Sequence, residues 1–353
     1  MSAKISILFI VNPISGIGKQ KKIEKLISQN IDTEKFDVSI KYTEYAGHAS
    51  VLAKEAVGNY DIVTAVGGDG SVNEIAKELQ STETALAIIP CGSGNGLARA
   101  LEIPVSPALA VKYLNKAEFK TIDTCEVNKQ FFLSLAGAGY DSEVARRYQF
   151  LDGRGFKTYF KAIIGSFYKY KPLEYRLNID GEIMVRKALL VTVCNSSQYG
   201  YGFKISPESE LDDGYMDVVI VKKPPLWRVP FVLLNIILGR AHKSRCFEII
   251  KCKNVELMGN KKGWVNLDGE TVRLDKSLEF EVKERNIVLF CQPPRFPNPN
   301  ELVKKMLEMQ KAQFRKTKMQ ITKAAKEVSK VTKEVTREIK STFDKDRRHD
   351  SNQ

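Results

Sequence analysis

The sequence has few of the residues that bind transition metals or build disulfide frameworks. It contains three histidines and six cysteines, and no two cysteines stand in a Cys-x-x-Cys pair. A zinc site needs four Cys or His ligands, usually at short spacings, so a zinc centre is not expected. Scattered cysteines are typical of proteins in a reducing compartment, and we therefore predict a cytoplasmic protein.

The sequence also lacks a long hydrophobic run. Its most hydrophobic segment, Phe231 to Leu238, has eight residues and contains Asn235. A membrane-spanning helix needs about twenty apolar residues, so no span is expected. The N-terminal segment MSAKISILFIVNP combines a short apolar run with no cleavage site, and it is predicted to form a first strand and not a signal peptide.

Positive charge is in excess, and it is unevenly distributed. The formal net charge is +13, and the tail from Glu301 onward holds fifteen Lys or Arg against eight Asp or Glu. An amphipathic helix in this tail is predicted by apolar residues at spacings of three and four: Ile321, Ala324, Val328, Val331, Val335, Ile339 and Phe343. Such a helix suits a membrane surface or partner, a coiled coil, or a solvated extension. Nucleic acid is not an expected partner, because aromatic residues do not interleave with the basic ones.

The pattern of apolar residues divides the chain into three parts. Short apolar runs alternate with helical spacings in residues 1–120, which predicts βαβ units and a parallel sheet with strands at 5–11, 36–42, 61–67 and 85–90. From Thr121, runs rich in β-branched and aromatic residues follow one another between turn signals, which predicts a mainly antiparallel β region over 121–296. Helical patterns there are few, near 154–170 and 226–240. Residues 297–353 are predicted to form the basic helical tail.

A glycine-rich loop follows the strand predicted at 61–67. It reads Gly67-Gly68-Asp69-Gly70-Ser71-Val72-Asn73-Glu74 and leads into a helix. Glycines let the backbone approach a ligand closely, and the free N–H groups at a helix start attract phosphate. A carboxylate in such a loop, here Asp69, would repel phosphate unless a metal bridges the two or the carboxylate handles a proton. The alternative is a tight turn in which Asp69 caps the helix.

A second glycine-rich loop, Pro90-Cys91-Gly92-Ser93-Gly94-Asn95-Gly96, follows the strand at 85–90. Two such loops in consecutive βα units lie at the same edge of a parallel sheet, where ligands bind. The segment Asn12 to Lys19 after the first strand is not a Walker A motif, because Pro13 stands where a glycine is required and Gln20 replaces Ser or Thr.

Two acidic motifs lie in the predicted β region. Leu267-Asp268-Gly269-Glu270 is typical of a hairpin turn. The segment from Glu210 through Asp213 to Tyr215 could hold Mg²⁺ through oxygen ligands, or form an acidic turn before a strand.

In this order and spacing, the motifs NPISG, GGDGSVNE, PCGSGNGLAR, LDDGYMD and LDGE resemble the catalytic domain of diacylglycerol, sphingosine and related bacterial lipid kinases. The resemblance covers the chain from Ile5 to about Phe296. It implies a nucleotide-binding α/β domain related to that of NAD kinases, a β-sandwich domain for the acceptor and an active site between them. It also implies transfer of phosphate from ATP, with Mg²⁺, to a lipid hydroxyl. A peripheral membrane surface at the inner face and a second copy in a homodimer are the further partners expected.

The resemblance assigns roles to individual residues. The proton acceptor is Glu270, with Asp268 beside it, or else Asp69. Mg²⁺ would bind the backbone carbonyls of Glu210 and Tyr215 and the side chain of Asp213. The ATP contacts would be Asn12, Thr43, Gly67, Gly68, Asp69, Gly70, Ser71, Val72, Asn73, Glu74, Gly92, Ser93 and Asn95.

The second loop departs from the bacterial pattern, which usually has Thr followed by Asn-Asp. Ser93 and Asn95-Gly96 stand there instead and are closer to sphingosine kinases, so both a glycerolipid and a sphingoid base remain open as acceptor. A soluble acceptor such as NAD, and a catalytically silent nucleotide or lipid sensor, are the alternative functions. Retention of Asp69, Asp268 and Glu270 argues against a silent protein.

Overall fold

A computed structural model describes residues 3–15, 22–152, 156–258 and 263–292. The amphipathic helix predicted in the tail lies outside these residues. Among the helices of the described ranges, none is both long enough and apolar enough to cross a bilayer.

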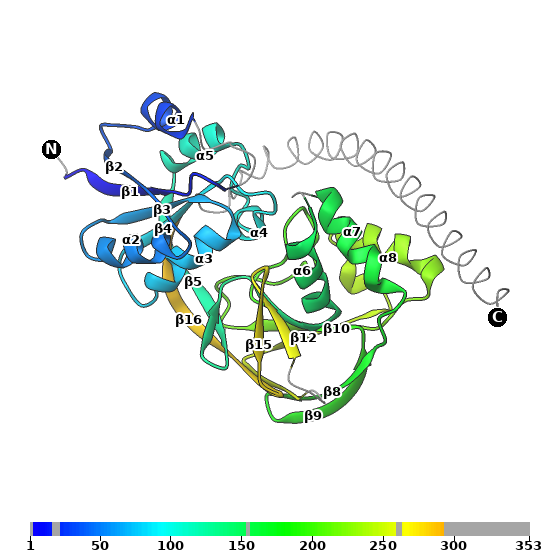
Figure 1. The fold of residues 1–353 in the computed structure, drawn as a ribbon. Coiled ribbons are helices and arrows are strands. Elements are labelled where there is room, and N and C mark those ends of the chain that lie inside the picture. The colour runs from blue at the N-terminus through cyan, green and yellow to red at the C-terminus, as the bar shows by residue number, and fades with distance from the viewer. Residues whose placement is uncertain (1–2, 16–21, 153–155, 259–262, 293–353) are drawn as a thin grey trace, which may run out of the picture. The chain divides into compact units, whose positions relative to one another are not determined.

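The N-terminal part of the chain folds into four parallel strands with helices on both faces (Figure 1). All four predicted strands are confirmed: β1, β3 and β4 are apolar runs that the helices bury, and β2, at the edge of the sheet, has a mixed sequence that is only partly buried. The strands, in the spatial order β2-β1-β3-β4, are β1 (Ile5–Val11), β2 (Phe36–Tyr42), β3 (Ile62–Gly67) and β4 (Ala85–Pro90). The helices are α1 (Ile23–Asn30), α2 (His48–Ala56), α3 (Asp69–Glu78), α4 (Gly96–Ala100) and α5 (Pro107–Leu114).

The parallel sheet continues without interruption into antiparallel strands. The long strand β16 (Ser277–Cys291) pairs in parallel with β4 at Leu289 and Leu86, and antiparallel with β5 (Glu118–Val127). One half of β16 belongs to the core of the parallel part, and the other half belongs to the core of the β region. The ten-stranded sheet is completed by β6 (Gln130–Phe132), β8 (Leu173–Ile179), β9 (Glu182–Ala188) and β13 (Asn254–Met258).

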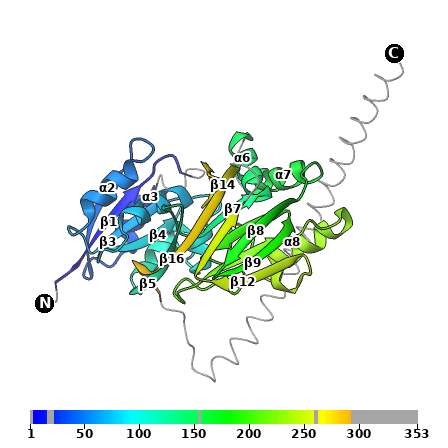
Figure 2. The ribbon, with the colours of Figure 1, turned by 90° about the horizontal axis from the view of Figure 1, so that it is seen from below.

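A second, antiparallel sheet of six strands packs against the antiparallel half of the first (Figure 2). Residues of both sheets, such as Leu177, Phe280, Val193 and Val218, share one buried core, as expected for sheets stacked face to face. In spatial order its strands are β12 (Phe247–Cys252), β11 (Met216–Val221), β10 (Leu190–Cys194), β7 (Leu135–Gly139), β14 (Gly263–Leu267) and β15 (Glu270–Leu274). The predicted mixture of a mostly parallel α/β sheet and an antiparallel β region is confirmed.

The outer face of the six-stranded sheet is covered by helices. The helical patterns near 154–170 and 226–240 are confirmed as α7 (Phe156–Phe167) and α8 (Val229–Ile237). The other elements on this side are α6 (Tyr140–Phe150) and the 3₁₀ turns η2 (Leu226–Arg228) and η3 (Ala241–Lys243). Within the predicted β region, the apolar run of residues 187–195 belongs to two strands. β9 ends at Ala188 and β10 begins at Leu190, and the two strands belong to different sheets.

The position of β16 generates a prediction about stability. Leu289 is 1% exposed, between β4 and β5, and its truncation to alanine should leave a cavity and lower the free energy of unfolding by about 3 kcal/mol. Leu173→Ala, the same change at a β8 side chain that is 49% exposed, should cost less than about 1 kcal/mol. Urea unfolding followed by circular dichroism measures both values. Equal losses in the two variants would contradict the assignment of Leu289 to a packed core.

Candidate active site

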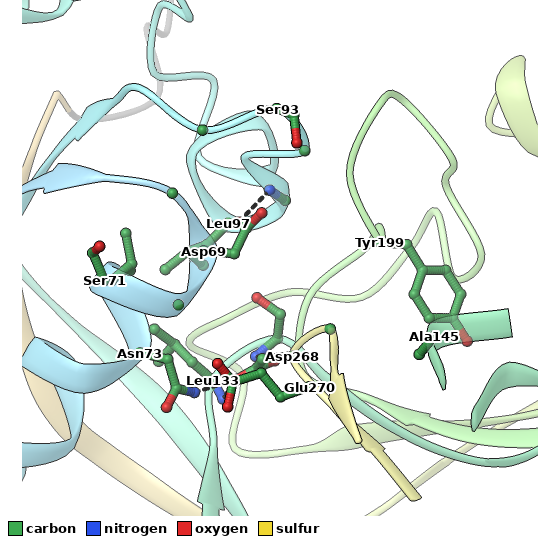
Figure 3. A pocket seen from close by; sticks show the side chains of 18 of the residues that line it. Asp69, Ser71, Asn73, Ser93, Leu97, Leu133, Ala145, Tyr199, Asp268 and Glu270 are labelled. Atoms are coloured by element: carbon green, nitrogen blue, oxygen red, sulfur yellow. Dashed lines mark hydrogen bonds between the residues drawn. The ribbon is translucent and has the colours of Figure 1, made fainter. Parts of the chain in front are cut away.

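A cavity of about 400 Å³ lies where the parallel strands end and the six-stranded sheet begins (Figure 3). The two glycine-rich loops and Asn12 line it from the N-terminal part of the chain, and the turn between β14 and β15 faces them. The predicted residues that line the cavity are Asn12, Gly68, Asp69, Gly70, Ser71, Val72, Asn73, Gly92, Ser93, Asp268 and Glu270. Motifs that are far apart in the sequence are therefore brought together.

The two glycine loops touch each other through their backbones. A Cβ atom on Gly92 would lie 2.5 Å from the Cα of Gly68, and one on Gly67 would lie 2.5 Å from the Ser71 hydroxyl oxygen. The N–H groups of Cys91 and Gly92 both donate to the Gly67 carbonyl, at 2.7 and 3.1 Å. The glycines are thus required by close approach, and only their absent side chains allow the loops to form one surface.

Asp69 connects the first loop to the second. Its two carboxylate oxygens accept hydrogen bonds from the N–H groups of Asn95 (2.9 Å) and Gly96 (2.7 Å). Burial raises the pKa of Asp69 to about 6, although these two donors oppose the shift. Helix α3 begins at Asp69 with Gly68 as its N-cap, and no side chain caps it. The alternative that Asp69 caps this helix is therefore wrong, because its carboxylate is directed at the second loop.

Asp268 is held by four donors. Its carboxylate accepts hydrogen bonds from the N–H groups of Leu133 (2.6 Å), Ser134 (2.8 Å) and Leu135 (2.9 Å), and from the side-chain amide of Asn73 (2.7 Å). Burial raises its pKa, and these donors act in the opposite direction. The side chain thereby ties the β14–β15 turn to helix α3 and to the chain entering β7.

The hairpin predicted at Asp268-Gly269 is confirmed. Leu267 pairs with Glu270 across a two-residue turn, and both turn residues have positive φ, 49° for Asp268 and 98° for Gly269. A two-residue turn with both φ values positive matches the twist of paired strands and favours Asp-Gly. The hairpin turn is thus part of the candidate site, because it presents Asp268 and Glu270 to the cavity.

Glu270 differs from the other two carboxylates because its side chain is held less firmly. It is exposed to the cavity, and a Cβ atom on Gly70 would lie 3.5 Å from its Oε1, so the carboxylate reaches the first glycine loop. Within the described ranges, no hydrogen bond or ion pair to its carboxylate is formed. Partial burial, followed by the negative charges of Glu74 and Asp268, raises its pKa above the usual value.

Several predicted residues lie behind the cavity wall. Within the described part of the chain, Thr43, Gly67, Glu74 and Asn95 are not among the lining residues. Thr43 donates its N–H to the Val11 carbonyl, and Glu74 accepts the N–H of Gly47 at 3.3 Å. These residues shape the loops and do not face the cavity directly.

The predicted Mg²⁺ ligands lie elsewhere, at the start of β11. One carboxylate oxygen of Asp213 accepts the N–H of Tyr215 at 3.0 Å, and the other pairs with the Lys251 ammonium at 2.5 Å. In the described ranges no group of three or more His, Cys, Asp or Glu side chains is arranged to hold a metal ion. Because two of the three predicted ligands are backbone carbonyls, this site stays a prediction.

The sequence analysis missed two parts of the site. Asn266 accepts the N–H of Gly269 (2.9 Å) and donates to the buried Asp141 (3.0 Å), so it fixes the turn that carries Glu270. Burial raises the pKa of Asp141 to about 7, with the hydrogen bond from Asn266 opposing. The segment Gln198 to Tyr201 also lines the cavity, and its alternating Tyr and Gly residues were the available signal.

Two glycine loops, a helix N-terminus and three carboxylates around one cavity are groups that suit a phosphotransferase. Comparison with known proteins gives the family. Residues 6–127 match the model of the diacylglycerol kinase catalytic domain, and residues 134–285 match the YegS C-terminal NAD kinase beta sandwich-like domain. The chain belongs to the diacylglycerol kinase catalytic-domain family.

Individual relatives agree with this assignment. The chain is 30% identical over 275 residues to a diacylglycerol kinase of Bacillus subtilis strain 168, covering 74% of this chain and 88% of the relative. It is 28% identical over 315 residues to one of Staphylococcus aureus strain bovine RF122 / ET3-1, covering 84% and 94%. A crystal structure of a diacylglycerol kinase from Bacillus anthracis strain Sterne has a similar fold, with a TM-score of 0.63, 21% identity and coverage of 83% and 99%.

The environment of Asp69 predicts a pH dependence of stability. Its pKa is about 6 in the folded protein and 3.8 for an ordinary aspartate, so the folded chain binds a proton between these values that the unfolded chain releases. The stabilisation of the folded state by this proton is complete below pH 3.8 and is lost as the pH rises through 6. Over this range the free energy of unfolding falls by at most about 1.4 kcal/mol per pH unit. Asp69→Asn should remove this component. Urea unfolding at several pH values between 4 and 7 measures the difference, and parallel profiles for the two proteins would contradict it.

Proposed function

We propose that this protein is an ATP-dependent lipid kinase that transfers the γ-phosphate of ATP to a hydroxyl group of a lipid acceptor. The observation that carries the proposal is the arrangement of Glu270, which faces the glycine loops across the cavity and has a carboxylate that none of the residues the structure describes engages. Its named relatives are diacylglycerol kinases. Residues 1–120 would bind ATP, and residues 121–296 would receive the acceptor.

The two glycine loops are suited to hold the phosphates of ATP. Gly68 and Gly92 put backbone at the cavity wall, and the N-terminus of α3 directs free N–H groups toward it. The hydroxyls of Ser71 and Ser93 and the amide of Asn12 add hydrogen-bonding groups to the same surface. Phosphoryl transfer requires mainly positioning and neutralisation of charge, which this rigid pair of loops would supply.

Glu270 is the proposed proton acceptor. The acceptor hydroxyl oxygen forms a bond to the γ-phosphorus, its proton passes to the Glu270 carboxylate, and the bond to ADP breaks. A carboxylate with a raised pKa is a stronger base than an ordinary one, and Glu270 has one. Asp268 accepts four hydrogen bonds and Asp69 two from the second loop, so we assign these two residues to holding the site in place.

Magnesium would accompany ATP into the cavity. The hard carboxylate oxygens of Asp69, which lines the cavity, match the ligand preference of this ion. Bound Mg²⁺ would neutralise negative charge on the phosphates. At the second proposed site, Asp213 would have to release Lys251 before its carboxylate could bind an ion.

A second, apolar cavity supports a lipid acceptor over a soluble one such as NAD. It has a volume of about 110 Å³ and lies between α6, α7, α8 and the six-stranded sheet. Tyr159 and Tyr199 line both this cavity and the active-site cavity, so the two adjoin. An acyl or alkyl chain placed among Val144, Val232 and Ile236 would leave its hydroxyl end on the side of the active-site cavity.

The surface above this apolar cavity supports peripheral contact with an anionic membrane. Trp227 and Phe231 are 66% and 65% exposed at the start of α8, whereas Val232 and Ile236 of the same helix face the cavity. From Val218 to Phe247 the charged residues are all Lys or Arg. Exposed aromatics with cations suit an interface with anionic lipids.

A labelled-ATP assay tests the function. The protein, with Mg²⁺, is incubated with mixed micelles of diacylglycerol, monoacylglycerol, sphingoid bases, ceramide or phosphatidylglycerol, and with NAD. Glu270→Gln should lower kcat for the lipid that accepts label by about 10² to 10⁴-fold, because general-base catalysis contributes that much. Its affinity for ATP should not change. Glu182→Gln, on the exposed end of the β8–β9 hairpin, is the matched control and should behave like the unmodified chain.

Other results of this assay would change the conclusion. Label in NAD alone would make the protein a kinase of a soluble acceptor. ATP binding without transfer to any compound would support a silent sensor. Full activity of Glu270→Gln would remove this residue from the mechanism.

The apolar cavity yields a separate prediction. Val232→Phe should fill part of the cavity and displace about two methylene groups of a bound chain, which lowers kcat/KM for long-chain acceptors by roughly tenfold. A short-chain analogue of the same lipid should be affected much less. Leu226→Phe, at a side chain that is 58% exposed, is the control. Equal loss for short and long chains in Val232→Phe would contradict a role of this cavity in chain binding.

A further inference from the structure

A tight loop from the β region is packed onto the second glycine loop. Residues Gln198 and Lys204 form an isolated β-bridge, and between them the chain reverses with Tyr201 near the tip. A Cβ atom on Gly200 would lie 3.2 Å from the backbone of Gly94, and one on Gly96 would lie 3.1 Å from the Tyr199 carbonyl oxygen. The N–H of Tyr201 donates to the Gly94 carbonyl at 3.3 Å. This loop therefore joins the acceptor side of the cavity to the nucleotide side.

Tyr201 occupies a backbone conformation that suits glycine. Its φ is 52°, between Gly200 at 118° and Gly202 at 84°. A bulky residue with positive φ costs of order 1–3 kcal/mol, so surrounding contacts must hold it there, and such residues cluster at functional sites. The flanking glycines tolerate this backbone without strain, whereas the tyrosine does not.

The side chain of Tyr201 lies among groups of both halves of the cavity. Its ring is 5.7 Å from that of Tyr159 on α7, and its hydroxyl is 3.3 Å from that of Tyr148 on α6. A Cβ atom on Gly94 would lie 3.0 Å from the Oδ2 atom of Asp69 and 3.8 Å from the Tyr201 ring, so the phenol ring and the Asp69 carboxylate approach the second glycine loop together. Burial raises the pKa of Tyr201, so the phenol keeps its proton at neutral pH and remains a donor.

We propose that Tyr201 is a further catalytic residue, whose hydroxyl donates a hydrogen bond to the phosphoryl group during its transfer from ATP to the acceptor. Ser93 and Gly94 belong to the loop that would hold the phosphates, and Tyr201, whose N–H donates to the Gly94 carbonyl, lines the same cavity. A neutral donor placed where negative charge spreads over the transferring oxygens stabilises the transition state more than bound ATP. This assignment rests on the proposed function of the site.

Tyr201→Phe is the direct test, because it removes one O–H and keeps the ring and the backbone. We expect kcat to fall about tenfold or more, with the KM for ATP changed less than twofold, as for loss of one hydrogen bond to a charged group. Tyr175→Phe makes the same change in the antiparallel core, outside the cavity, and should leave both constants unchanged. An unchanged kcat in Tyr201→Phe would overturn the assignment.

A binding measurement separates this proposal from the proposed function. Calorimetry compares the affinity of each protein for ADP with Mg²⁺ and aluminium fluoride, which imitates the transferring phosphoryl group, and for ADP with Mg²⁺ alone. Tyr201→Phe should bind the fluoride complex about tenfold more weakly than the unmodified chain and bind ADP equally well. This readout needs no lipid, so it holds even if no acceptor is phosphorylated. Equal affinity of both proteins for the fluoride complex would overturn the role of Tyr201.

Discussion

The contact between the backbones of Gly68 and Gly92 is the constraint on which the rest of the site depends. Because neither residue has a side chain, the two consecutive βα loops lie close together. The Gly67 carbonyl can therefore accept hydrogen bonds from two N–H groups of the second loop. Only at this distance can the Asp69 carboxylate reach the N–H groups of the next helix. A single methyl group on Gly92 would separate the loops and, with them, the groups suited to hold a phosphate chain.

The second half of the site is placed by a strand that joins both cores. β16 pairs with β4 at one end and with β13 at the other, so the six-stranded sheet has a fixed place relative to the parallel strands. Asp268 then locks the local geometry, because Asn73 from α3 and the N–H groups of Leu133 to Leu135 converge on one carboxylate. The facing turn is thereby positioned by hydrogen bonds from both sides of the cavity.

Much of this arrangement could be predicted from local sequence, and the rest depends on contacts distant along the chain. The parallel strands and the two glycine loops follow from apolar runs and turn residues, which are local signals. The pairing of Leu289 with Leu86 could not be predicted, because period and composition do not specify a distant partner. Asp69, Asp268 and Glu270 stand in motifs with a recognisable chemistry. Asn266 resembles any polar residue of a strand, and Tyr201 any aromatic of a turn, until the fold brings them to the cavity.

The three carboxylates differ in the hydrogen bonds that they accept, and this difference separates their proposed roles. Asp268 accepts four hydrogen bonds, so a proton on its carboxylate would have to displace a donor that the fold itself uses. Asp69 accepts two hydrogen bonds from the second loop, one on each carboxylate oxygen, and so joins the two loops. Glu270 loses no such bond when it takes a proton, and its pKa is raised by burial and by neighbouring negative charge. A base that returns to its starting state after each turnover should be the group whose protonation disturbs the structure least. By this criterion Glu270 suits the proton transfer, while the two aspartates keep the loops and the turn in register with it.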